Sequence, residues 1–269
     1  MKQYAVIQED FQEVGFEQLK EVLVKYGGIA NADAARAARK HRGVLSERLT
    51  LEQAGRVCAA LKSLGFAVRA VPAEKLPDIK KGRRACWLEL KDDHLVIPHG
   101  TTGKVNNVPW QSVFVISAGQ IAEAHERRIE TVSYNSSHSR IPEVDHDVEK
   151  YSTLTHVTEL IGIATTGRYI HARLPAQQMN YGRILGADLI KQGFFAKYLT
   201  MLDVLVARCT NALVSPETRE LLSERKQRYE SRQGDHHELA EERKFTHYNR
   251  WLLQLAVIRL AEANKQNEI

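Results

Sequence analysis

The residues best suited to chemistry in this sequence are basic side chains that cluster near residue 82. Two further arginines join the cluster if the strands that carry them align with it. Six residues make up this candidate binding site: Lys80, Lys81, Arg83, Arg84, Arg127 and Arg128. Clustered lysine and arginine side chains bind phosphates and carboxylates through charge-assisted hydrogen bonds. We therefore predict binding of a phosphate-bearing head group or an acidic peptide here, and the alternative is a solvated linker between two domains.

Histidines occur in two groups with acidic residues nearby. The groups are His138 with Asp145, His146 and Asp147, and His236 with His237 and Glu241. A structural zinc site needs three or four ligands that converge on the metal, and a metalloprotease helix needs the HExxH spacing, which neither group has. We therefore interpret these histidines as surface residues and predict no metal and no cofactor.

The candidate nucleophiles give no recognisable catalytic pattern. The sequence lacks the G-x-S-x-G elbow of hydrolases. Cys58 and Cys209 fall on apolar faces of expected helices, where a thiol is normally inert, whereas Cys86 begins an expected strand close to basic residues. We predict no catalytic residue and hence no enzyme. The alternative is an enzyme whose site residues meet in space without a sequence motif.

Length and composition limit the classes of protein to which this chain can belong. The chain has 269 residues, 43% of them hydrophobic and 26% charged, which is enough apolar material for about two folded domains. A net charge of +5 permits binding to nucleic acid or an anionic surface without requiring it. Three separated cysteines favour a reducing compartment, and no apolar stretch has the length of a membrane span. We therefore predict a cytoplasmic protein without a membrane span.

Residues 1–73 are expected to form a βααβαβ domain. Strands are predicted at 4–8, 44–49 and 66–71, with helices after Phe16, after Asn31 and after the N-cap Thr50, and Gly65 ends the last helix. The stretch Leu51 to Val68, with Gly28-Ile29 and Ala34, resembles the C-terminal domain of the bacterial ribosomal stalk protein. That resemblance implies the fold only, because Asn31, Ala32 and Ala35 stand where the family has its factor-recruiting lysines.

Residues 74–84 are expected to be a linker, and residues 85–214 a second domain of short strands closed by one helix. The predicted strands include 87–90, 94–97, 113–116 and 129–134, with an exposed loop over 135–150. A stripe of apolar residues from Phe195 to Leu213 predicts the closing helix. The hairpin from Trp87 to Ile97 and the Val108-Pro109-Trp110 entry resemble a bacterial pleckstrin-homology-like domain, which implies a β-barrel or sandwich.

Residues 215–269 are expected to be helical. Ser215 caps the first helix and Pro216 suits its first position, and the charges of the following segment balance. The apolar end around Trp251 must be covered, so this helix either packs on its own chain or pairs with a second copy in a homodimer.

Taken together, these patterns predict an α+β protein, similar to uncharacterised bacterial proteins, that works as a protein- or peptide-binding scaffold. The alternative partner is nucleic acid, in a basic RNA- or ribosome-associated protein, as suggested by the net charge of +5 and the stalk-domain resemblance.

Overall fold

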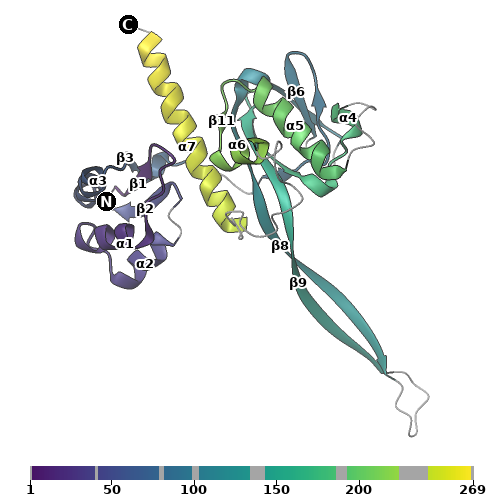
Figure 1. The fold of residues 1–269 in the computed structure, drawn as a ribbon, viewed down its shortest axis with the longest axis horizontal. Helices are drawn as coiled ribbons and strands as arrows, with labels where there is room; N and C mark the ends of the chain where they lie inside the picture. The colour runs from purple at the N-terminus through teal and green to yellow at the C-terminus, as the bar shows by residue number, and fades with distance from the viewer. Residues whose placement is uncertain are drawn as a thin grey trace.

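The protein is an α+β molecule in which three sheets are held together by helices (Figure 1). The structure is a computed structural model. It describes residues 2–39, 42–78, 82–98, 103–133, 143–185, 193–223 and 242–267.

The N-terminal unit has the predicted βααβαβ order. Its elements are β1 (Tyr4–Gln8), α1 (Phe16–Lys25), α2 (Asn31–Ala38), β2 (Val44–Leu49), α3 (Leu51–Ser63) and β3 (Val68–Pro72). The strands form one antiparallel sheet in the order β2-β1-β3. Apolar residues of the three helices and of the strands form one core between the helices and the sheet.

Local sequence signals set the ends of α3 as predicted. The Thr50 hydroxyl accepts a hydrogen bond from the Gln53 backbone N–H at 3.2 Å, and the Gln53 side chain accepts one from the Thr50 N–H at 2.9 Å. This reciprocal capping box satisfies two donors at the start of the helix. Gly65 follows the helix with φ +90°, a conformation that costs glycine little.

The rest of the chain builds two further sheets. The first strands are β4 (Arg83–Arg84), β5 (Glu89–Leu90), β6 (His94–Pro98) and β7 (Val105–Pro109), followed by β8 (Val113–Ser133), β9 (Glu143–Ile163) and β10 (Tyr169–Pro175). Then come α4 (Gly182–Leu185), α5 (Phe194–Arg208), β11 (Leu213–Val214), α6 (Pro216–Ser223) and α7 (Glu242–Asn267), with short 3₁₀ turns at 73–75, 110–112 and 176–178. The five-stranded sheet has the order β11-β8-β9-β10-β4, and β5-β6-β7 form the third sheet.

The apolar stripe of α5 packs on the five-stranded sheet, with residues such as Leu199 and Leu202 buried. The helix ends at Arg208, and Leu213 belongs to β11 instead of extending the helix as predicted. Among the described residues no barrel closes, because the third sheet stays separate from the five-stranded sheet. The predicted linker contains a strand, since β4 pairs in parallel with Ala172 and Arg173 of β10.

Strands β8 and β9 extend far beyond the other strands of their sheet as a two-stranded arm (Figure 1). The predicted strand at 113–116 and residues 129–133 of the predicted strand at 129–134 belong to one strand. Residues 134–142 lie outside the described residues, and the rest of the predicted loop over 135–150 overlaps β9, which begins at Glu143. The sequence pattern missed this arm because charged and polar residues occur at both alternate sets of positions over 143–150.

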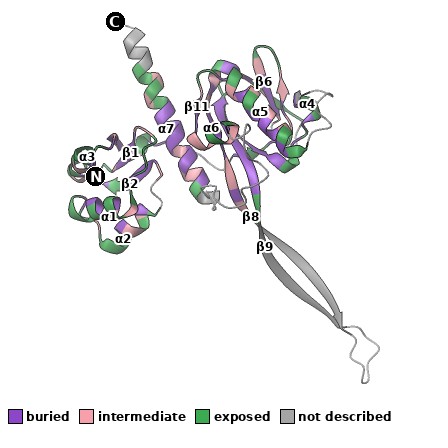
Figure 2. Ribbon diagram, viewed as in Figure 1, coloured by how far each residue is buried: buried purple, intermediate pink, exposed green. Residues whose placement is uncertain are grey.

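Helix α7 lies between the N-terminal unit and the five-stranded sheet (Figure 1), and its N-terminal half is largely buried (Figure 2). One apolar cluster joins Ala5 and Ile7 of the first sheet, Val157 and Ile161 of the second, and the α7 residues Phe245, Tyr248, Trp251, Leu252, Leu253, Leu255 and Ala256. Of the two predicted ways to cover Trp251, the structure shows the first, because its side chain is buried within its own chain at 2% exposure.

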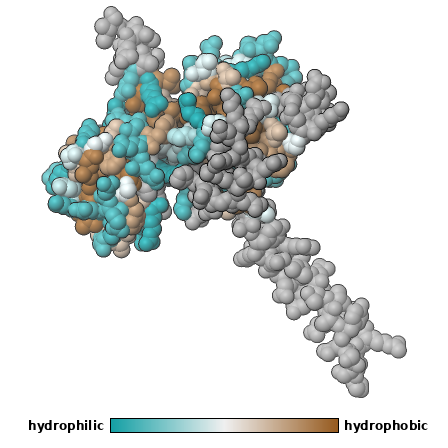
Figure 3. Space-filling view, viewed as in Figure 1, coloured by the Kyte–Doolittle hydropathy of each residue, from teal (hydrophilic) through white to brown (hydrophobic). Residues whose placement is uncertain are grey.

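The described surface is mixed in character. On the face shown in Figure 3, hydrophilic residues lie over much of the described surface, with apolar residues between them. Helix α7 is the longest described helix, and neither it nor any other described helix is apolar enough over a sufficient length to cross a membrane.

Candidate anion-binding site

The structure places the six predicted binding residues in three different situations. Arg83 and Arg84 form β4 and are exposed. Lys80 and Lys81 lie outside the described residues. Arg127 and Arg128 lie on β8, with only their backbone described, at the register positions opposite Glu149 and Val148.

Strand register separates the two arginine pairs. Arg83 lies beside Ala172, which pairs with Leu160, and Leu160 pairs with Ile116 of β8. Arg127 follows Ile116 by eleven positions on β8. At about 3.3 Å per residue this is roughly 36 Å along the strand. The strands therefore do not bring Arg127 and Arg128 to Arg83 and Arg84.

Arg83 instead lines a pocket of about 230 Å³, here called the basic pocket, between the edge of β10 and the sheet of β6 and β7. Its polar lining carries two guanidinium groups, an imidazole, a phenol, an amide and one carboxylate. The lining residues are Asp78, Arg83, Ile97, Pro98, Asn106, Arg168, Tyr169, Ile170, His171 and Ala172.

A tight turn positions the β10 side of the basic pocket. Between β9 and β10, the Gly167 N–H donates to the Ala164 carbonyl at 2.8 Å, and Ala164 N–H donates to the Arg168 carbonyl at 2.8 Å. Gly167 has φ +75°, which favours glycine there. The turn places Arg168 and Tyr169 at the start of β10, ahead of the two residues that pair with β4.

Behind the basic pocket lies a buried ionic cluster of Glu159, His171 and Arg173. Arg173 is directly opposite Glu159 in the register, and His171, two residues earlier on β10, shares the face of Arg173. The Arg173 Nε donates to Glu159 Oε1 at 2.5 Å, and His171 Nε2 contacts Glu159 Oε2. Glu159 and Arg173 are at most 1% exposed. One carboxylate oxygen thus lies against a guanidinium and the other against an imidazole.

Gly82, directly before β4, passes over this cluster. A Cβ at position 82 would overlap the Glu159 carboxylate and crowd the His171 ring. Only glycine therefore lets the chain pass over the cluster and turn into β4. His171, which contacts Glu159, also lines the basic pocket.

The phenol of Tyr169 stays neutral in this setting. Tyr169 is 44% exposed, and its partial burial and the negative charge of Glu159 both raise its pKa above the ordinary value. A neutral phenol can donate a hydrogen bond to an anion at any pH near neutrality. Together with Arg83, Arg168 and Asn106, it makes the basic pocket rich in donors suited to carboxylate or phosphate oxygens.

The histidine groups considered as metal ligands are not tested by the structure. His138, His236, His237 and Glu241 lie outside the described residues, as do the side chains of residues 145–147. Within the part of the chain that is described, no group of three or more His, Cys, Asp or Glu residues could hold a metal ion. The pocket lining described above also carries no serine, threonine, cysteine or lysine.

Sequence reasoning found Arg83 but missed the other polar groups of the site. His171 and Arg173 alternate with Ile170, Ala172 and Leu174, which is the pattern of a strand with one polar face. That pattern indicates that this face of the strand packs against a charged group. It gives no information on the partner, because Glu159 reaches Arg173 only through the pairing of β9 with β10.

No family model, no curated protein and no solved structure matches this chain. The resemblances to the ribosomal stalk domain and to a pleckstrin-homology-like domain therefore stay predictions. What the chain offers as evidence of function is its own geometry, above all the basic pocket and the cluster that supports it.

Proposed function

We propose that this protein is a non-enzymatic binding module that takes an acidic segment of a partner protein in the basic pocket. The observation that carries the proposal is the convergence of Arg83 and Arg168, from two different segments, on one pocket with His171 and Asn106. Arginine guanidinium groups form bidentate hydrogen bonds with carboxylates, which gives geometric selectivity as well as attraction.

The position of the basic pocket supports a peptide as the ligand. Within the described residues, β4 pairs only with Ala172 and Arg173, so the earlier part of β10 borders the pocket. An extended peptide can lie along such a sheet edge and use main-chain hydrogen bonds for affinity. Acidic side chains of that peptide would then reach Arg83 and Arg168.

The proposal is tested by fluorescence anisotropy with a labelled Asp/Glu-rich peptide and its Asn/Gln counterpart. We expect saturable binding of the acidic peptide only. The double variant Arg83→Ala/Arg168→Ala should weaken it about tenfold or more, as expected for charged hydrogen bonds at a partly enclosed site. Arg84→Ala is the matched control, because Arg84 is the next residue of β4, equally charged and exposed, but not in the pocket lining.

Equal loss of affinity in the control and the double variant would show that bulk charge, not the basic pocket, holds the peptide. The same assay with bulk RNA addresses the alternative of an RNA- or ribosome-associated protein. Tight RNA binding with a steep dependence on salt concentration, unaffected by Arg83→Ala/Arg168→Ala, would favour that alternative over the binding module.

A second candidate function rests on the contact between His171 and Glu159. An imidazole oriented by a buried carboxylate and lining a pocket is the arrangement that general acid–base catalysis uses. The corresponding function is an enzyme that acts on a small anionic substrate. Turnover of an anionic compound that is lost in His171→Asn would favour the enzyme.

A further inference from the structure

A second pocket, here called the junction pocket, lies where the N-terminal unit, α6 and α7 meet. It has a volume of about 220 Å³, and it has no residue in common with the basic pocket. Its lining residues come from four segments of the chain: Gln8, Phe11, Gln12, Glu13, Arg42, Gly43, Pro216, Glu217, Glu220, Tyr248 and Trp251.

Three aromatic rings form one wall of the junction pocket. The Trp251 ring lies 5.4 Å from Phe11 at 84° and 5.4 Å from Tyr248 at 46°, measured between ring centroids and planes. The indole N–H of Trp251 donates to the Gln8 carbonyl at 2.8 Å. Gly43 packs against the indole so closely that a Cβ there would overlap the ring. The Trp251 ring is therefore held in place before any ligand arrives.

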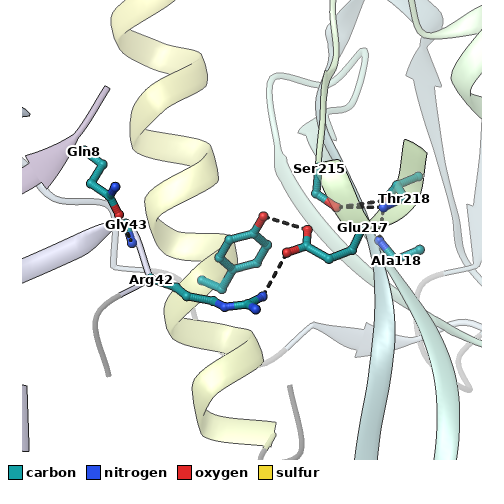
Figure 4. A network of polar contacts seen from close by, with 8 residues as sticks. Gln8, Arg42, Gly43, Ala118, Ser215, Glu217 and Thr218 are labelled. Carbon is teal, nitrogen blue, oxygen red and sulfur yellow. Dashed lines mark hydrogen bonds and ion pairs between the residues drawn. The ribbon is translucent and has the colours of Figure 1, made fainter. Parts of the chain in front are cut away.

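The charges of the junction pocket are predominantly negative. Its described lining contains the carboxylates of Glu13, Glu217 and Glu220 against the single guanidinium of Arg42. Arg42 extends across α7 to Glu217 (Figure 4), with 2.9 Å between Nη1 and Oε1. The other Glu217 oxygen accepts the Tyr248 hydroxyl at 2.8 Å. Glu13 and Glu220 are exposed, so they contribute charge at the solvent side.

Helix α6, which carries two of these carboxylates, is fixed to the five-stranded sheet. The Ser215 hydroxyl accepts from the Thr218 N–H at 3.3 Å and so caps α6, which begins at Pro216 as predicted. The Thr218 hydroxyl in turn accepts the Ala118 N–H of β8 at 2.7 Å (Figure 4). Glu217 and Glu220 therefore line the junction pocket from a helix that is hydrogen-bonded to the five-stranded sheet.

The chain's own arginines show what the rings of this wall attract. The Arg42 Cζ lies 5.9 Å from the Tyr248 centroid, and the Arg259 Cζ lies 6.0 Å from the Phe11 centroid. Both distances are within the range of a cation–π interaction. Aromatic rings combined with carboxylates attract organic cations, because the ring quadrupole and the anions attract the same charge.

We propose that the junction pocket binds the ammonium or guanidinium group of a ligand. A volume of about 220 Å³ suits a side-chain-sized cation. It is below the roughly 300 Å³ at which pockets for drug-sized ligands begin. The proposal is independent of the basic pocket, which has the opposite charge preference and different lining residues.

The test follows the three tryptophan indole N–H signals by NMR, assigned with Trp87→Phe and Trp110→Phe. The probes are N-acetyl-arginine methylamide and spermidine, with N-acetyl-norleucine methylamide as the uncharged counterpart. We expect a saturable shift of the Trp251 signal with a cationic probe and none with norleucine. If only the arginine derivative saturates the signal, the ligand is a peptide side chain. If only spermidine saturates it, the ligand is a free polyamine. Either result supports the proposal.

Two variants separate binding from a merely structural role of these residues. Glu220→Gln should lower the affinity for the cationic probe about two- to fivefold, the size expected for an exposed ion pair. Phe11→Leu keeps an apolar side chain at a position that is 37% exposed, and it should lower this affinity as well. Glu21→Gln is the matched control, an equal charge change on the exposed face of α1. Absence of a saturable Trp251 shift, an equal response to norleucine, or equal affinities in Glu220→Gln and Glu21→Gln would overturn the proposal.

Discussion

At the scale of single residues, the buried cluster of Glu159, His171 and Arg173 links the sequence to the proposed site. A charged side chain without a partner in the interior costs several kcal/mol. The three residues are tolerated there because adjacent strands place them in direct contact. Their residue types and alternation were visible in the sequence, whereas their contact depends on strand pairing that the sequence pattern does not specify.

Removal of the cation from this cluster should be strongly destabilising. Arg173→Met leaves the Glu159 carboxylate buried with only His171, so we expect a loss of about 3 to 5 kcal/mol in the free energy of unfolding. Urea denaturation monitored by circular dichroism measures it. The double variant Arg173→Met/Glu159→Leu should recover much of the loss, because no charge then remains uncompensated. An effect below about 1 kcal/mol for Arg173→Met alone is incompatible with the buried pair.

Tyr248 should make the stability of the protein fall at high pH. Burial, followed by the neighbouring Glu217, raises the pKa of Tyr248 above its ordinary value. Above about pH 10 the unfolded chain releases this proton while the native protein keeps it. The native state then binds more protons, so unfolding becomes easier as pH rises. The contribution of this phenol to the free energy of unfolding is fully present below about pH 10.

Urea titrations between pH 9.5 and 11.5 test this dependence. Tyr248→Phe should make the decline shallower by about 1.4 kcal/mol per pH unit, which is the effect of one proton. It should not abolish the decline, because burial also raises the pKa of Tyr181 and raises that of Cys209 to about 12. Tyr26→Phe, at an exposed position of the N-terminal unit, is the control. An unchanged slope in Tyr248→Phe would contradict this role of the buried phenol.

At the scale of elements, sequence reasoning succeeded where caps and amphipathic patterns are local. The strand at 4–8, the start of α3 after Thr50 and the start of α6 after Ser215 agree with the structure. It did not predict the continuous β8–β9 arm or β4, which is only two residues long. These strands are stabilised by pairing with distant residues, which the sequence pattern does not specify.

Helix α3 contains a glycine that the fold does not need. Gly55 is exposed in the interior of the helix, and a Cβ there would meet no atom within 4 Å. Gly55→Ala should therefore raise the free energy of unfolding by about 0.5 to 1 kcal/mol, because alanine has the higher helix propensity. Thermal denaturation provides the measurement. A lower melting temperature in this variant would mean that α3 is not the helix described here.

At the scale of the whole molecule, α7 gives two sheets a common core. Its residues pack against strands of both the first and the five-stranded sheet in one apolar cluster. The composition predicted about two domains, and the sequence pattern correctly indicated that the apolar side around Trp251 had to be covered. It did not show what covers it, since the covering residues include Ala5, Ile7 and Val115, which lie more than a hundred positions away in the sequence.

A substitution at Gly43 tests the packing of α7 on the N-terminal unit, because Gly43 packs directly on Trp251. Gly43→Ala combines a positive φ of +83° with overlap of the indole ring. We expect a loss of about 2 to 4 kcal/mol in the free energy of unfolding. Gly65→Ala is the matched control, with φ +90° but open space around its Cβ. It should cost only the conformational part, about 1 to 2 kcal/mol. Equal losses in calorimetry would mean that α7 does not pack on Gly43.

The most direct test of the basic pocket is an NMR titration with the acidic peptide, observing the side-chain Nε–H signals of the arginines. The signals of Arg83 and Arg168 should shift together and saturate, while the signal of Arg84 stays in place. Shifts spread evenly over exposed arginines, or confined to positions outside the basic pocket, would show that the peptide does not bind in the basic pocket.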